Sequence, residues 1–100
     1  MGEFEELTLL AVRALAPPVY AVPVQRVLER STSRSVVMGA VYAALDRLEA
    51  KGFLASTMGP PTAERGGKRK RLFAVTPSGM RAVRDLRATR DRLWRAIEER

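Results

Sequence analysis

The residues of this chain whose types and spacing could do chemistry are basic, and they are densest in one short segment. Five of the seven residues from 65 to 71 are arginine or lysine, and Gly66-Gly67 lies among them. Clustered cations neutralise phosphates, and paired glycines let a backbone turn tightly and approach a partner closely. The chain as a whole carries 18 basic and 11 acidic residues, a net charge of +7. This pattern favours a nucleic acid as the partner over a merely solvated basic loop.

The stretch from Val36 to Leu54 predicts a helix that runs directly into a strand. Its apolar residues recur with the spacing of one helix face: Val37, Val41, Leu45 and Leu48. Ser35 is expected to cap the first turn, because its hydroxyl can accept a hydrogen bond from a backbone amide there. Gly52 is expected to end the helix, because glycine adopts the required left-handed conformation cheaply.

The opposite face of this helix begins with unusually small residues, Gly39, Ala40, Ala43 and Ala44. Small side chains let a helix backbone come close to another molecule. Two interpretations fit this stretch equally well when it is considered alone. It is either a packed core helix with a thin polar face, or a helix that enters a DNA major groove with Tyr42 and its first turn at the contact.

The elements before this helix would hold it in place. Residues 3–15 predict a first helix that is apolar nearly all round, a pattern typical of a helix at the centre of a core or shared with a second subunit. Residues 22–30 predict a short second helix, and the polar residues 31–35 form the turn into the third. Two short helices joined in this way form a helix-turn-helix.

The elements after it would carry the basic segment. Residues 53–58 and 71–75 predict two strands of a hairpin, with a break at Gly59-Pro60-Pro61, so the cations lie in the loop of a wing. A last helix is predicted from Pro77 to about Glu99, with Thr76 as its N-cap. That helix is longer than a small winged domain needs to cover itself, which indicates packing on another subunit. The predicted fold is mainly α with a small antiparallel β-hairpin, with a winged helix-turn-helix at 1–76 and a dimerisation helix at 77–100.

Composition argues against several other classes. The chain has no cysteine and no histidine, which excludes zinc sites with these ligands, thiolate chemistry and imidazole catalysis. We therefore expect neither an enzyme nor a metal or cofactor site. The acidic N-terminus is unlike a signal peptide, and no apolar run has the length of a membrane span, so we expect a cytoplasmic protein without membrane contact.

Residues 39–54, GAVYAALDRLEAKGFL, resemble the G-x-L-Y-x-x-L-x-R-L-E-x-x-G-L signature of the PadR family of bacterial transcriptional regulators. Residues 61–79, PTAERGGKRKRLFAVTPSG, resemble the wing motif of the same family. The resemblance covers essentially the whole chain. It implies a winged helix-turn-helix homodimer that represses transcription by binding an operator in double-stranded DNA. It also implies that a small-molecule effector relieves the repression. We would expect the pocket for this effector at the dimer interface, because the chain has no separate ligand domain. The apolar start of the third helix, Val36-Val37-Met38, departs from the polar side chains expected of a base-reading surface.

These arguments give two sets of candidate residues. The predicted DNA-binding residues come from the third helix, its approach and the wing: Arg34, Ser35, Val37, Met38, Gly39, Ala40, Tyr42, Ala43, Arg47, Arg65, Gly66, Gly67, Lys68, Arg69 and Lys70. The predicted dimer-interface residues come from the first and last helices: Phe4, Leu7, Leu10, Val83, Leu86, Leu93, Trp94 and Ile97. Trp94 is expected to be an interface residue, with ligand stacking as the alternative. A protein–protein adaptor that uses the same scaffold is the second hypothesis for function.

Overall fold

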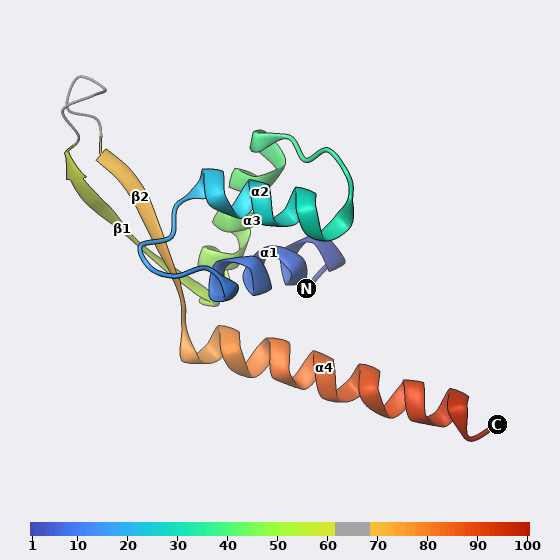
Figure 1. Cartoon of the computed structure of the whole chain (residues 1–100). Coiled ribbons are helices and arrows are strands. Elements are labelled where there is room, and N and C mark those ends of the chain that lie inside the picture. The colour runs from blue at the N-terminus through green and yellow to red at the C-terminus, as the bar shows by residue number, and fades with distance from the viewer. Residues whose placement is uncertain (62–68) are drawn as a thin grey trace.

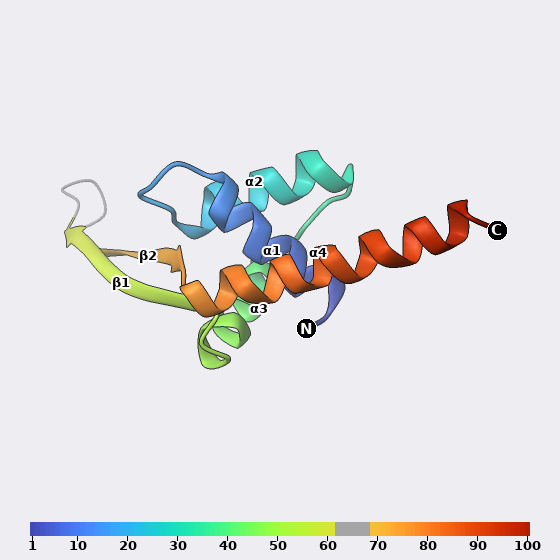
Figure 2. The same ribbon diagram turned by 90° about the horizontal axis from the view of Figure 1, so that it is seen from below.

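A computed structural model of the chain describes residues 1–61 and 69–100. The described elements follow in the order α1, α2, α3, β1, β2, α4, and the first three helices pack together into one body (Figure 1). The hairpin of β1 and β2 leaves one side of this body. Helix α4 runs away from it, and both views show its C-terminal end standing free (Figure 2). The prediction of a mainly α chain with a winged helix-turn-helix and a long last helix is confirmed.

The core lies where α1 (Glu3–Ala14), α2 (Ala21–Thr32) and α3 (Met38–Ala50) meet. Each helix contributes apolar side chains at three- and four-residue spacing, so that one stripe of each faces the others. The most deeply buried of these residues are Leu9, Val12, Val24, Leu28, Val41, Leu45 and Leu48. Helix α2 is longer than predicted and ends at Ser33, whose backbone is left-handed with φ of 54°.

The start of α3 differs from the sequence prediction. Ser35 does not cap the helix; Val37 occupies the N-cap position, with no side-chain cap. The reason lies in α2, which holds the preceding residue in place. Glu29 accepts a hydrogen bond from the Val36 amide at 3.0 Å, and the Gln25 amide donates to the Val36 carbonyl at 2.7 Å. The chain therefore stays extended through Val37, and the helix begins at Met38.

The end of α3 follows the prediction. Gly52 has φ of +79°, and its amide donates to the Glu49 carbonyl at 2.9 Å. The Phe53 amide donates to the Leu48 carbonyl at 2.9 Å, which completes a Schellman motif. Strand β1 begins at the next residue, so only three residues, Lys51, Gly52 and Phe53, separate the helix from the hairpin.

The hairpin consists of β1 (Leu54–Pro61) and β2 (Arg69–Val75), paired antiparallel with Leu54 opposite Val75. The predicted break at residues 59–61 is wrong, because β1 continues to Pro61 with an irregular register after Met58. The side chain of Arg69 explains how this end is held: its Nε donates to the Gly59 carbonyl at 2.7 Å. Residues 69 and 70, expected in the loop, belong to β2.

Backbone contacts hold the hairpin and the start of α4 (Pro77–Glu98) against the body. The Phe73 amide donates to the Val19 carbonyl at 2.8 Å, so a short piece of chain before α2 lies along β2. Thr76 caps α4 as predicted, accepting from the Gly79 amide at 3.0 Å. A side chain at Gly79 would overlap the backbone carbonyl of Phe53, so α4 starts tightly against the junction of α3 and β1.

Candidate nucleic-acid interface

The outer face of α3 is exposed and narrow. Val41, Ala44, Leu45 and Leu48 are buried, so the placement of Ala44 on the outer face was wrong: its side chain packs with the core stripe. Gly39 and Tyr42 lie on the surface, and Tyr42 is 45% exposed. A side chain at Gly39 would meet nothing within 4 Å, so the fold itself does not require a glycine there. The small first half of this face therefore leaves room for a molecule outside the chain.

Tyr42 also forms one wall of a groove between the helices and the hairpin, with a volume of about 500 Å³. The start of α2 forms a second wall and the hairpin a third. The residues lining it are Tyr20, Ala21, Val22, Pro23, Arg26, Tyr42, Met58, Arg69, Lys70 and Arg71. Four of them are cations and none is acidic, so the groove suits an anion such as a DNA phosphate.

The four cations of the groove differ in how far they are engaged within the chain. Arg69 donates to the Gly59 carbonyl and, at 3.3 Å, to the Met58 carbonyl. The Lys70 ammonium stands 4.1 Å from the centroid of the Tyr20 ring, a cation–π contact that leaves its N–H groups able to donate. Arg26 is exposed and makes no ion pair in the part of the chain that the structure describes.

Arg71 is the most engaged of the four. It donates to Asp46 at 2.6 Å and to Glu49, both on α3, and to the hydroxyl of Ser56 on β1 at 3.2 Å. These acceptors raise the pKa of Arg71 above its usual value, the hydrogen bond to Asp46 most of all. Hydrogen bonds from Ser56 and then Arg71 lower the pKa of Glu49. Both charges of the Arg71–Glu49 pair are thus stabilised.

Arg47, predicted at the DNA, forms an ion pair with Glu5 of α1 at 3.2 Å. Lys51 reaches the same carboxylate at 2.6 Å, and its hydrogen bond is the main reason that the pKa of Glu5 is lowered. Half of the Arg47 side chain remains exposed, at 54%. The structure therefore places this cation at the junction of α3 with α1, away from the groove residues.

The remaining predicted DNA-binding residues lie in two places. Arg34, Ser35 and Val37 are exposed ahead of α3, while Met38, Ala40 and Ala43 are half-buried in it. Arg65, Gly66, Gly67 and Lys68 lie outside the described residues. Sequence reasoning missed the other seven groove residues, because their part in the groove comes from the packing of α2 beside the hairpin: Tyr20, Ala21, Val22, Pro23, Arg26, Met58 and Arg71.

The predicted dimer residues separate into covered and uncovered groups. Val83 is 6% exposed and packs in the core of its own chain, and Phe4, Leu7 and Leu86 are half-buried. The uncovered group is apolar and lies on α1 and the far half of α4: Leu10 at 44%, Leu93 at 62%, Trp94 at 63% and Ile97 at 53% exposed. The last described contact that ties α4 to the body before these residues is the ion pair of Arg90 with Glu6, at 2.6 Å.

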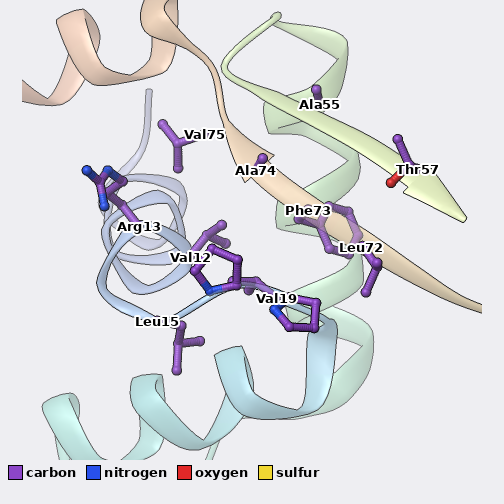
Figure 3. A pocket seen from close by; sticks show the side chains of 12 residues that line it. Val12, Arg13, Leu15, Val19, Ala55, Thr57, Leu72, Phe73, Ala74 and Val75 are labelled. Atoms are coloured by element: carbon purple, nitrogen blue, oxygen red, sulfur yellow. The ribbon is translucent and has the colours of Figure 1, made fainter. Parts of the chain in front are cut away.

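Two of the hollows formed by the described residues are large enough to hold a small molecule. One, of about 480 Å³, is mainly apolar and lies between the end of α1 and the hairpin, with Val12 and Leu15 on one side and Leu72 and Phe73 on the other (Figure 3). The other, of about 640 Å³, borders Phe4, Leu7 and Arg90. It therefore touches both helices of the predicted dimer interface.

The described part of the chain holds neither a metal-binding cluster nor a membrane-spanning helix. No group of three or more acidic side chains there could hold a metal ion. Nor is any described helix both long and apolar enough to cross a membrane.

The chain matches known proteins along most of its length. A family model described as the transcriptional regulator PadR-like family matches residues 9–85. A PadR-like transcription factor from Bacteroides fragilis has 20% identity and a TM-score of 0.76, covering 96% of this chain and 87% of its own. A PadR family regulator from Eggerthella lenta has 23% identity and a TM-score of 0.70, covering 97% and 84%. A PadR-like regulator from Bacillus cereus has 16% identity and a TM-score of 0.71, covering 96% and 88%. No curated protein matches the sequence significantly.

Proposed function

The chain belongs to the PadR-like family of transcriptional regulators, and we propose that it represses transcription as a homodimer bound to an inverted-repeat operator in double-stranded DNA. Binding to DNA follows from the family. The repression, the dimer, the operator symmetry, the site residues and an effector are the parts that we propose.

The observation that carries the proposal is the cationic groove beside the outer face of α3. Its walls bring Arg26, Lys70 and the hydroxyl of Tyr42 to one concave surface without an acidic residue in the lining. Phosphate contacts from such a surface fix the orientation of a protein on a duplex. The small face that begins at Gly39 then lies against the major groove, in the manner of a recognition helix.

The exposed apolar residues of α1 and α4 support the dimer. Leu93, Trp94 and Ile97 are each more than half exposed, at the spacing of one helix face. Large apolar side chains grouped in this way mark an interaction surface. In this proposal residues 1–76 bind DNA, residues 77–100 join the two copies, and a small molecule in the hollow beside Phe4, Leu7 and Arg90 relieves repression.

A footprint on the DNA upstream of the protein's own gene tests the proposal. A two-fold dimer presents two copies of α3, so we expect two protected blocks related by a dyad and about one helical turn, or roughly 34 Å, apart. A protected site without dyad symmetry would contradict the operator model.

The second candidate, an adaptor that binds an acidic protein partner, gives a different result in the same assay. Phosphates carry no sequence information, so an adaptor with a basic surface would retain DNA weakly and lose it to random competitor DNA. A specific regulator keeps its site when that competitor is added. Complete loss of every protected block would favour the adaptor.

A further inference from the structure

The contact between α3 and the hairpin depends on a small group of side chains. Only Lys51, Gly52 and Phe53 join the two elements along the backbone, and an isolated two-stranded hairpin is marginally stable by itself. In Figure 1 the hairpin and α3 leave this junction in different directions. The angle between them must therefore be fixed by contacts between side chains further along each element.

Arg71 supplies these contacts from the middle of β2. Its guanidinium donates to Asp46 and Glu49 on α3 and to Ser56 on the neighbouring strand. The Ser56 hydroxyl also donates to Glu49, with distances of 2.7 and 2.9 Å to its two oxygens. We call these four residues, Asp46, Glu49, Ser56 and Arg71, the Arg71 clamp. The planar guanidinium fixes direction as well as distance, which a lysine in its place could not do.

The buried ring of Phe73 supports the guanidinium of Arg71 from the core side. The guanidinium carbon of Arg71 lies 4.9 Å from the centroid of the Phe73 ring, and Phe73 is only 4% exposed. The Arg71 and Glu49 side chains are each 33% exposed and Asp46 is 60% exposed, so the Glu49 side of the clamp is better shielded from solvent than the Asp46 side. A hydrogen-bonded network in such surroundings has one favoured geometry.

The charges of the clamp show that it does not serve affinity for DNA in general. It contains two carboxylates and one guanidinium, a net charge of −1, and of these three charged residues only Arg71 lines the groove. Negative charge near a duplex weakens binding to any sequence. The guanidinium is already committed to three acceptors, which leaves it poorly placed to neutralise a phosphate.

We propose that Arg71 is a positioning residue: through the clamp it sets the angle between α3 and the hairpin, so that one DNA site can engage both. This rests on the proposed function, because it assumes that both elements bind DNA. The clamp then favours the operator over random sequence. A phosphate contact by Arg71 is the competing role, and the two roles predict opposite results.

The first experiment measures the angle without DNA. The chain has no cysteine of its own, so spin labels can be attached at Gly39→Cys on α3 and Thr57→Cys on β1. Labelled chain is mixed with excess unlabelled chain, so that only distances within one copy are recorded. We expect one narrow distance distribution, which broadens in Arg71→Gln. An unchanged distribution in Arg71→Gln overturns the clamp whether or not the protein binds DNA.

The second experiment measures DNA binding by Glu49→Gln. Loss of a carboxylate near DNA should strengthen binding to random DNA, whereas loss of the clamp should weaken binding to the operator by roughly tenfold, about what one lost charged hydrogen bond costs. The matched control is Asp85→Asn on α4, where the carboxylate is exposed and makes no ion pair in the described residues. Tighter operator binding by Glu49→Gln overturns the proposal.

The salt dependence of Arg71→Gln separates positioning from a phosphate contact. A positioning residue lowers operator affinity and leaves the log–log salt slope unchanged. A phosphate contact lowers the slope by about 0.9 per subunit, and that result would overturn the proposal. The double variant with Glu49→Gln should lose no more operator affinity than Arg71→Gln alone, because both changes remove the same clamp. If Arg71→Gln does not fold, Ser56→Ala removes one hydroxyl of the clamp and should weaken operator binding in the same direction.

Discussion

Replacing Arg26 and Lys70 with alanine together should remove most of the phosphate binding in the described part of the groove. Arg71 is committed to the clamp and Arg69 to the carbonyls of β1, which leaves these two cations per subunit free to meet DNA. A dimer then loses up to four phosphate contacts, and at about 0.9 per contact the log–log salt slope falls by roughly 3.6. If the variant and the original protein bind equally at about 1 M salt, this difference in slope makes the variant bind roughly a thousandfold more weakly at about 0.15 M salt.

The assay is fluorescence anisotropy of a labelled operator and of a random duplex over a series of salt concentrations. Both duplexes should lose affinity together, because phosphate contacts carry no sequence information. The matched control replaces Arg84 and Arg87, two exposed arginines of α4, with alanine and keeps the same net charge as the test variant. If the test variant and the control have the same slope, the groove does not bind phosphate and the site is placed wrongly.

Four further predictions concern stability, assembly and the α3 face. Leu93→Glu should shift the dimer towards an 11.1 kDa monomer in sedimentation equilibrium, because a partner would bury an unpaired carboxylate; an unchanged dimer would remove α4 from the interface. Gly79→Ala should lower the free energy of unfolding by about 1–3 kcal/mol in urea titrations, because its methyl group overlaps a backbone carbonyl; a neutral effect would contradict the tight start of α4. Gly39→Leu should leave the melting temperature within a few degrees of the original, since nothing lies near, and abolish operator binding; retained binding would mean that DNA does not approach this part of α3. Glu5 and Glu49 have a lowered pKa in the folded chain, so their stabilising effect is complete above the ordinary value of 4.5 and is lost as the pH falls through the lowered values. The melting temperature should therefore fall at acid pH, and it should fall less steeply in Glu49→Gln; an unchanged fall would contradict the role of Glu49.

The sequence predicted the elements whose causes are local. Gly52 and Thr76 mark helix ends through the conformation or hydroxyl of one residue, and both act as expected. The start of α3 was misplaced because Glu29 and Gln25, several residues away, hold the chain extended at Val36. The capping preference of Ser35 and its neighbours contains no information about these two hydrogen bonds to Val36.

The candidate site was predicted as a count of cations, and a count says nothing about partners. Arg71 appeared as one of five basic residues, but the structure joins it to two acids of α3 that lie 22 and 25 positions away. Arg47 likewise meets Glu5, 42 positions earlier. Tyr20 and Arg26 were missed because both lie far from the basic segment in the sequence, although the fold brings them to the same groove.

The crowded start of α4 has a mechanical consequence. The Thr76 amide donates to the Phe53 carbonyl at 3.0 Å and its hydroxyl to the Gly52 carbonyl at 2.7 Å, so α4 begins at the same two residues where α3 passes into β1. In the proposed dimer these two residues would be the pivot of α4, which with 22 residues is a lever about 33 Å long, and turning it would release the ion pair of Arg90 with Glu6. A turn of about 5° at the pivot moves the far end of that lever by about 3 Å. In the proposed dimer, a modest shift where the two copies meet would therefore reach α3 in one step, and it would change the separation of the two copies of α3 more than the shape of either.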